Sequence, residues 1–433
     1  MQQIKLGNGM LINGDNLEIM KRYEDNYFDN CISDFPYDLG FMGKKWDTYN
    51  NFYEWCKQRA EGLFRIIKHG GYVLIFGHHK TNHRMKCAFE DAGFKIVEEI
   101  DWCYASGFPK NQDIGKLFDK DAKVTRRGTG KFNSSKGVRS GDNNLVGDNY
   151  NCKGYEITLP ETDLAKQWNG WKTSGLKPAK EIVTVFQKPL KGKYIDNIKE
   201  YGCGAMNIDA CRVEYKNQAD LDLVKAKCSF TENSKSIGFG TADSLYGTGN
   251  TPLEQARDCV KEEGRFPANI IFDTYMGQVL DKQSGERASG KSNNNAPKGE
   301  SGRLTPLRRG TLVPRNDTGG ASRFFLNIDQ EDFIPFMYCS KPTKKEKGEY
   351  CSHITVKPKK LIKWLIKLVT PIDGKSLDIT AGSGTHGLSC EELNKEEEYN
   401  IEWVDIELLN TEKEPYCEIA KRRIEEVIKN KSA

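Results

Sequence analysis

The stretch Leu377-Asp378-Ile379-Thr380-Ala381-Gly382-Ser383-Gly384-Thr385 decides the fold of this chain. Its apolar start predicts a buried strand, its Gly-x-Gly predicts a tight turn, and residues 385–393 have the pattern of a helix. Glycines there let the backbone bend sharply and let a ligand approach it closely. Gly-x-Gly alone also fits a plain tight turn. The strand-turn-helix order favours an α/β fold with a ligand at the turn.

A second predicted strand, residues 400–405, strengthens this interpretation. It ends at Asp405, about twenty residues after the turn, where a carboxylate can accept hydrogen bonds from ribose hydroxyls. Both dinucleotide-binding proteins and methyltransferases use this geometry. A full Gly-x-Gly-x-x-Gly is missing, which weakens the dinucleotide alternative.

The first hundred residues alternate between predicted strands and helices, and a further strand is predicted after residue 180. Short apolar runs predict strands, and longer amphipathic stretches predict helices, in the rhythm of a parallel sheet. The predicted strands are residues 30–34, 72–76, 95–102 and 181–186, and the predicted helices are residues 51–68 and 79–92. Further helices are predicted at residues 359–369 and 416–428.

Two polar blocks interrupt this pattern. Residues 113–169 are rich in Gly, Asn, Ser, Lys and Arg, so we expect a flexible insert there. Residues 191–340 are the least regular part, and their run 284–320 carries Arg303, Arg308, Arg309 and Arg315. This run is either a solvated insert or an arm that contacts phosphates.

The amino-acid composition limits the location, partners and metal sites that we expect. The 433 residues include 37% hydrophobic and 29% charged residues, with no apolar run long enough for a membrane span and no apolar leader. We therefore expect a cytoplasmic protein. The net charge of +4 is weak support for a nucleic-acid partner. The 13 cysteines form no C-x-x-C pair, and His78, His79 and His83 lack a carboxylate pattern, so we predict no metal site.

The tetrapeptide Asp34-Phe35-Pro36-Tyr37 follows the first predicted strand. Its residue types also fit a surface turn. A carboxylate and a neighbouring carbonyl can, however, accept both hydrogens of an amino group, and an aromatic ring can stack on a planar base. Such stacking contributes about 1–3 kcal/mol, which helps offset the cost of flipping a base out of a duplex.

Together these motifs resemble the amino-group DNA methyltransferases, in particular the permuted beta class and a prophage-type subgroup. The family motif Asp-Pro-Pro-Tyr corresponds to residues 34–37, and Asp-Pro-Phe-x-Gly-Ser-Gly-Thr corresponds to residues 378–385. Residues 353–358 are similar to its His-Pro-Thr-x-Lys-Pro, and Asn13-Gly14-Asp15-Asn16 to its Gly-Asp element. Weaker matches are residues 106–110, 176–181 and 416–420.

The resemblance implies a Rossmann-like α/β methyltransferase sheet with helices on both faces, circularly permuted. It implies a catalytic half (1–190), an inserted irregular target-recognition region (191–340) and a cofactor-binding half (341–433). S-adenosylmethionine is the implied cofactor. The residues implied to hold it are Asp15, Lys357, Asp378, Thr380, Ala381, Gly382, Ser383, Gly384, Thr385 and Asp405.

The implied reaction is methylation of the N6 amino group of a flipped adenine in double-stranded DNA, as in restriction-modification systems. The catalytic residues would be Asp34, Phe35, Pro36 and Tyr37, and we expect Lys44, Lys45, Arg303, Arg308 and Arg309 to contact DNA. Adenine is favoured because the motif begins with Asp, whereas cytosine-N4 members commonly begin with Ser. Cytosine-C5 chemistry needs a cysteine, typically after proline, and the chain has no Pro-Cys.

Departures from the family pattern keep alternatives open. Phe35 replaces a proline, and Ile354 replaces another before Thr355. Ile379-Thr380 replaces Pro-Phe, so Thr380 lacks the aromatic surface that packs on the cofactor in the family. Cytosine-N4 methylation and a DNA-binding relative with weakened catalysis are the alternatives for function. Methylation of RNA or of a glutamine side chain is disfavoured by the motif order. A homodimer and a restriction partner stay open.

Overall fold

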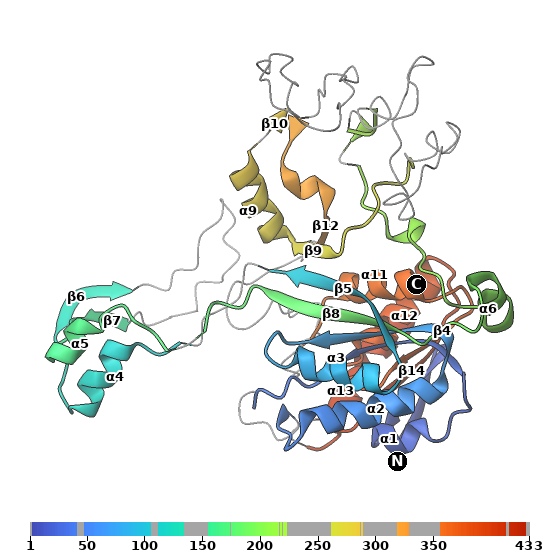
Figure 1. The fold of residues 1–433 in the computed structure, drawn as a ribbon, viewed down its shortest axis with the longest axis horizontal. Coiled ribbons are helices and arrows are strands. Elements are labelled where there is room, and N and C mark those ends of the chain that lie inside the picture. The colour runs from blue at the N-terminus through green and yellow to red at the C-terminus, as the bar shows by residue number, and fades with distance from the viewer. Residues whose placement is uncertain are drawn as a thin grey trace, which may run out of the picture.

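The computed structural model describes residues 2–40, 47–104, 111–133, 155–173, 175–215, 217–218, 220–222, 261–285, 287–288, 318–328, 356–412 and 415–429. Figure 1 shows these parts as a sheet flanked by helices, from which two further segments extend.

A ten-stranded sheet forms the centre of the molecule, and most of its central strands are parallel. β8 lies between β4 and β5 and is antiparallel to both. Strands β3 and β4 are buried along nearly their whole length, as expected for parallel strands covered on both faces. In spatial order the strands are β1 (Gln2–Leu6), β2 (Gly9–Asn13), β14 (Glu402–Glu407), β13 (Lys375–Asp378), β3 (Phe28–Asp34), β4 (Ile67–Gly77), β8 (Lys180–Gln187), β5 (Lys95–Cys103), β9 (Ile270–Asp273) and β12 (Leu326–Ile328).

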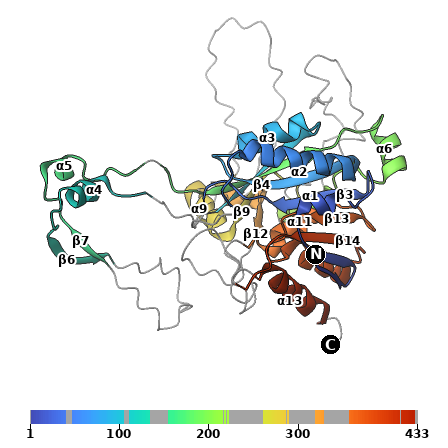
Figure 2. The same ribbon diagram turned by 90° about the horizontal axis from the view of Figure 1, so that it is seen from below.

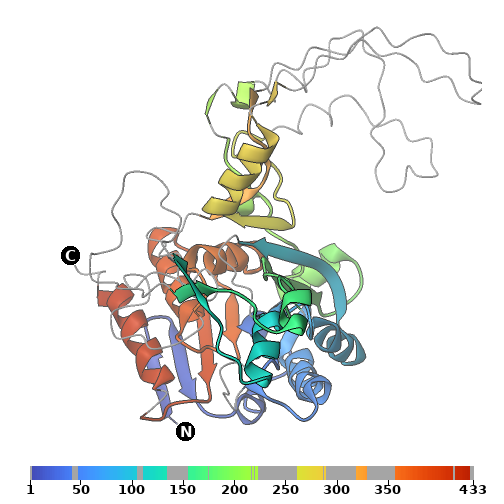
Figure 3. The same ribbon diagram turned by 90° about the vertical axis from the view of Figure 1, so that its left-hand side faces the viewer.

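Helices cover both faces of this sheet (Figures 1 and 3). One hydrophobic cluster joins the sheet to α1 (Asn16–Met20), α2 (Phe52–Ile66) and α3 (Asn82–Asp91). The other joins it to α11 (Lys359–Val369), α12 (Thr385–Glu396) and α13 (Tyr416–Lys429). The short helix α6 (Tyr194–Tyr201) packs beside β4. The expected α/β architecture with helices on both faces is confirmed.

Segments from the two ends of the chain lie side by side in the middle of the sheet. β13 pairs in parallel with β3, with Ser376 opposite Asn30 and Leu377 opposite Cys31. β14 pairs in parallel with β2. This pairing brings the motif at residues 34–37 and the glycine turn together at the carboxyl ends of β3 and β13.

The described part of residues 113–169, where a flexible insert was expected, contains regular secondary structure. That part folds into an arm of α4 (Ile114–Asp121), β6 (Gly128–Asn133), β7 (Tyr155–Thr158) and α5 (Asp163–Gln167), which stands away from the sheet (Figure 2). A buried carboxylate organises it. Asp119 accepts hydrogen bonds from the amides of Glu161 and Thr162 and from the Thr162 hydroxyl, and it pairs with Arg126. Polar contacts thus stabilise the arm, because its apolar content is low.

The irregular block after residue 190 is partly built into the sheet. β9 pairs in parallel with β5, and β12 pairs in parallel with β9, so this segment extends the sheet edge. Its remaining described elements are η3 (Asp209–Cys211), α9 (Thr274–Ser284), β10 (Arg287–Ala288), β11 (Thr318–Gly319) and η5 (Ala321–Phe324). Arg303, Arg308, Arg309 and Arg315 lie outside the described residues, as do Lys44 and Lys45.

Within the described ranges, none of the helices has the length and apolar character needed to cross a bilayer.

Candidate active site

A cavity of about 390 Å³ opens at the carboxyl ends of β13 and β3. The chain leaves β13 toward β14 on one side and leaves β3 toward β4 on the other. Such a point, where neighbouring strands connect in opposite directions, is where open α/β sheets bind ligands. Its volume lies within the range of small-molecule sites.

The glycine turn forms one wall of this cavity. Gly382 and Gly384 both have left-handed backbone conformations, with φ of 54° and 71°, which favour glycine. A Cβ on Gly384 would also lie 2.7 Å from Cβ of Ala420 on α13. The predicted cofactor residues that line the cavity are Asp15, Lys357, Asp378, Thr380, Ala381, Gly382, Ser383 and Thr385.

Asp378 ends β13 and is held by contacts within the sheet. Its Oδ1 accepts hydrogen bonds from the Ser33 hydroxyl (2.6 Å) and from the Thr380 amide (2.9 Å). Burial, together with the nearby Asp405, raises the pKa of Asp378. The residue therefore ties the glycine turn to β3.

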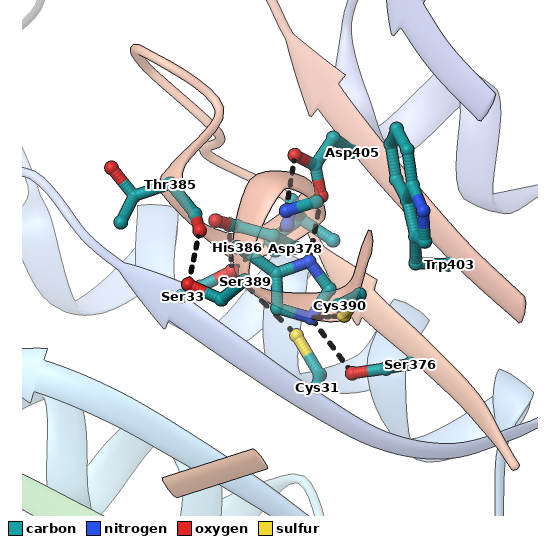
Figure 4. A network of polar contacts seen from close by, with 12 residues as sticks. Cys31, Ser33, Ser376, Asp378, Thr385, His386, Ser389, Cys390, Trp403 and Asp405 are labelled. Carbon is teal, nitrogen blue, oxygen red and sulfur yellow. Dashed lines mark hydrogen bonds and ion pairs between the residues drawn. The ribbon is translucent and has the colours of Figure 1, made fainter. Parts of the chain in front are cut away.

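Asp405 does not line the cavity, contrary to its predicted ribose-binding position. It is fully buried, and its two oxygens contact Nδ1 of His386 (2.7 Å) and the amide of Gly387 (3.0 Å). Figure 4 shows this contact as part of a polar network behind the turn, in which His386 also meets Ser376. Burial opposes the charge on His386, but Cys390 and Asp405 raise its pKa well above the usual value.

Glu407 is the carboxylate of β14 that lines the cavity. β14 continues to Glu407, two residues beyond the predicted end, so Glu407 lies on the same side of the strand but reaches the cavity. Its carboxylate accepts the amides of Gly382 (2.7 Å) and Leu409 (2.8 Å), and burial raises its pKa to about 7. The apolar residue Ile406 after Asp405 was the sequence signal that the strand continues.

Asp15 and Asn16 close the cavity from the start of α1. Asp15 caps this helix by accepting the amides of Leu17 (2.8 Å) and Glu18 (3.4 Å). The Asn16 side-chain amide donates to the carbonyl of Ile379 (2.9 Å). The N-terminal Gly-Asp element therefore adjoins the glycine turn.

The tetrapeptide Asp34-Phe35-Pro36-Tyr37 forms the opposite wall, and all four residues line the cavity. The loop is held by the buried Asp47, whose carboxylate accepts the amides of Tyr37 (2.7 Å), Asp38 (2.9 Å) and Leu39 (3.2 Å). The Thr81 hydroxyl donates to the carbonyl of Tyr37 (2.8 Å). Sequence reasoning assigned no role to Asp47 or Thr81.

The two departures from the family motifs have visible contacts. The Phe35 side chain is buried against the edge of Trp55, with ring centroids 5.2 Å apart, so an aromatic residue fits where the family has proline. The Thr380 hydroxyl donates to the Asp34 carbonyl at 3.1 Å. Thr380 thus joins the glycine turn directly to the tetrapeptide.

Lys357, which the resemblance groups with the cofactor residues, lines the cavity beside Asp34. Its Nζ lies 2.6 Å from Oδ2 of Asp34 and 3.2 Å from Oε2 of Glu181. Desolvation raises the pKa of Asp34, an effect that Lys357 opposes and Glu181 reinforces. Glu181, at the start of β8, is a site residue to which sequence reasoning gave no role.

Among the residues that the structure describes, no cluster of three or more His, Cys, Asp and Glu side chains is placed to hold a metal ion. His78 instead lies against Tyr37, with ring centroids 5.8 Å apart, and lines the cavity.

Comparison with known proteins places this site in context. A protein-family model described as DNA methylase (N6_N4_Mtase) matches residues 28–422. The type II methyltransferase M.HindIII of Haemophilus influenzae is 23% identical over 233 residues, which is 52% of this chain and 59% of that protein. M.HpaI of Haemophilus parainfluenzae is 28% identical over 116 residues, 25% of this chain and 36% of that protein. The matches therefore span less than two thirds of either relative.

Two solved structures align over nearly the whole chain at low similarity. The PvuII DNA methyltransferase (cytosine-N4-specific) is 13% identical with a TM-score of 0.42, covering 99% of this chain and 92% of that one. TTHA0409, a putative DNA modification methylase from Thermus thermophilus complexed with S-adenosyl-L-methionine, is 11% identical with a TM-score of 0.36, covering 96% and 95%.

Proposed function

Since the chain belongs to the DNA methylase family whose model matches residues 28–422, we propose that it transfers a methyl group from S-adenosylmethionine to N6 of adenine in duplex DNA. The observation that carries the proposal is one cavity with the glycine turn on one wall and Asp34-Phe35-Pro36-Tyr37 on the other. A methyl donor and an amino group held at these walls would meet inside the cavity.

The residues of the glycine-turn side fit S-adenosylmethionine. Asp15, Asp378 and Glu407 line this side of the cavity, which favours a ligand that carries a positive sulfonium. Glu407 at the end of β14 suits the ribose hydroxyls, because an ionised carboxylate has acceptor sites beyond the two amides it already binds. Leu408, Leu409 and Tyr416 supply apolar surface for a purine ring. When bound, the cofactor supplies an electrophilic methyl group.

The tetrapeptide suits an amino group on a planar base. Tyr37 offers a ring for stacking, and the Asp34 carboxylate and the Phe35 carbonyl accept the two amino hydrogens. These contacts aim the nitrogen lone pair along the line of transfer. Asp34 stabilises the positive charge that develops on nitrogen, so no prior deprotonation and no covalent enzyme intermediate is needed. Positioning alone can lower such a barrier by about 7–11 kcal/mol.

Adenine is the proposed base because the motif begins with Asp34, which is the family's usual residue for adenine-N6 chemistry. Cytosine-N4 methylation is the second candidate, since cytosine also presents an exocyclic amino group to a carboxylate and a carbonyl.

DNA recognition is assigned to parts of the chain outside the catalytic walls. We place target recognition within residues 191–340 and expect Lys44, Lys45, Arg303, Arg308 and Arg309 to contact phosphates. Such contacts would weaken steeply with added salt. The target base must be flipped into the cavity, at a cost of a few kcal/mol that stacking on Tyr37 helps offset.

Product analysis tests the proposal. The purified chain is incubated with isotopically labelled S-adenosylmethionine and DNA from a methylation-deficient host, and the nucleosides are separated by mass spectrometry. N6-methyladenine supports the proposal, and N4-methylcytosine supports the second candidate. Label in neither, together with no cofactor binding by calorimetry at millimolar concentration, favours a DNA-binding relative that has lost catalysis. Sequencing the modified bases in an expressing host then gives the target site.

A further inference from the structure

Asp34 belongs to a cluster of four polar side chains that come from distant parts of the chain. Lys357 precedes α11, Glu181 starts β8, and Tyr37 lies in the same loop as Asp34. The ammonium of Lys357 lies 2.6 Å from Oδ2 of Asp34, 3.2 Å from Oε2 of Glu181 and 3.2 Å from the Tyr37 hydroxyl. An ammonium carries three donors, so it can contact all three of these groups.

The cluster places two carboxylates beside one hydroxyl. The Tyr37 hydroxyl lies 3.1 Å from Oδ1 of Asp34 and 3.1 Å from Oε2 of Glu181. A phenol has one proton, so it donates to one of the two carboxylates at a time. Two carboxylates this close favour binding an extra proton unless a cation balances them. Lys357 supplies that cation.

The balance between the two carboxylates and the ammonium of Lys357 is important because these groups are largely buried. The side chains of Lys357 and Glu181 are only 10% and 5% exposed, so solvent screens their charges little. The Lys357 ammonium also lies over the ring of Phe76, 4.9 Å from its centroid, which fixes its position. His78, which follows β4, and Asp378 at the end of β13 also line the cavity. So does Asp47, whose carboxylate holds the loop that follows Asp34. The other titratable side chains that line it are Asp15, Tyr49, Arg59, Tyr104, His386, Glu407 and Tyr416.

We propose that Lys357 and Glu181 are positioning residues that keep Asp34 ionised and aimed for accepting the amino group, with Glu181 anchoring the ammonium of Lys357. This inference rests on the proposed function, in which the ionised Asp34 is the form that accepts the hydrogen bond. It assigns Lys357 to the base side of the cavity and gives Glu181 a role in the reaction.

The proposal predicts shifts of opposite sign in the pH dependence of single-turnover methyl transfer. The rate falls at low pH as Asp34 becomes protonated. The midpoint of this acid limb of the pH–rate profile therefore reports the titration of Asp34. Lys357→Met removes the cation and should move the limb up by about 1–3 pH units. Glu181→Gln removes the second carboxylate and should move it down. The double variant should lie between the single ones, and Lys357→Arg should stay near the wild type.

Lys359→Met is the matched control. Lys359 lies two residues from Lys357 but pairs with Glu392 of α12 at 2.8 Å. The same change there should leave the acid limb in place. If Lys357 only stabilised the fold, Lys357→Met would lower the rate by the same factor at every pH. An unshifted limb in Lys357→Met, or shifts of the same sign in Lys357→Met and Glu181→Gln, would overturn the proposal.

A readout without catalysis separates this inference from the proposed function. The carboxyl carbons of aspartate are labelled with carbon-13, and the Asp34 signal is assigned by its loss in Asp34→Asn. Its NMR titration should move in the same opposite directions in the two single variants. Absence of methyl transfer by the wild type would contradict the proposed function alone, whereas identical Asp34 titrations would contradict this inference. If Lys357→Met does not fold, Glu181→Gln and the charge-balanced double variant give the same decision.

Discussion

The hydroxyl of Thr380 donates a hydrogen bond to the backbone carbonyl of Asp34 across 3.1 Å, although the two residues are 346 positions apart in the sequence. The contact joins the glycine turn to the proposed catalytic tetrapeptide. It gives a physical role to the residue at which the turn departs most from the family pattern.

Thr380→Val should slow methyl transfer by a modest factor, because it removes this hydrogen bond and keeps the side-chain shape. A neutral hydrogen bond contributes about 1 kcal/mol, which corresponds to roughly a fivefold change. Single-turnover rates measure the effect. Thr380→Ser retains the hydroxyl and should behave as the wild type; a loss as large as that of valine would show that the contact is not what matters.

Asp34→Ala should lower methyl transfer by at least about a hundredfold, since it removes the acceptor that stabilises charge developing on nitrogen. Cofactor binding, measured by calorimetry, should change little because the Gly382 and Glu407 side of the cavity is intact. Full activity of Asp34→Ala would remove Asp34 from the mechanism.

Glu407→Gln and Asp405→Asn should have different effects. Glu407 lines the cavity, so its change should weaken S-adenosylmethionine binding by about tenfold, the size expected for a charged hydrogen bond. Asp405 contacts His386 and Gly387 inside the protein, so its change should lower the melting temperature. Calorimetry and thermal unfolding of both variants measure this. A larger affinity loss in Asp405→Asn would restore the ribose role to Asp405.

The stability of the cofactor-free protein should fall as pH rises from about 4.5 to about 7. Burial raises the pKa of Glu407 to about 7 from its ordinary 4.5, so the folded state holds this proton more tightly than the unfolded state. Its contribution is full below the unfolded pKa and is lost as pH rises through the folded pKa. Urea unfolding at several pH values tests this. Glu407→Gln should flatten the slope in this window, and an unchanged slope would speak against the assignment.

Asp119→Ala should unfold the arm and spare the sheet. The carboxylate of Asp119 accepts two amides and a hydroxyl from residues 161–162 and pairs with Arg126, so its loss leaves these groups without their shared partner. Hydrogen exchange should become fast in residues 113–133 and 155–173, while β3 and β4 keep their protection. The exposed pair Lys166–Asp163, broken by Lys166→Ala, is the control and should change neither region.

Local patterns were enough to predict six of the ten strands of the sheet, namely β3, β4, β5, β8, β13 and β14, whereas β1, β2, β9 and β12 were not predicted. The apolar runs before Asp34 and Asp378, and the glycines that follow Asp378, identify strand ends without knowledge of the tertiary structure. Glu181 and Lys357 could not be placed, because their meeting at Asp34 depends on how β8 and the segment before α11 pack together. The sequence did not distinguish residues 405 and 407, because a period-two strand puts both on the same side and only the position of the strand end decides which one reaches the cavity.

The pairing of β13 with β3 and of β14 with β2 has a consequence for biosynthesis. A ribosome must make residues 375–407 before the slot between β2 and β3 can be filled. Until then the nascent chain exposes two apolar strand edges, which are templates for aggregation. We expect the unfinished polypeptide to need shielding by a chaperone, and its modifying activity to begin only after translation has passed these last strands.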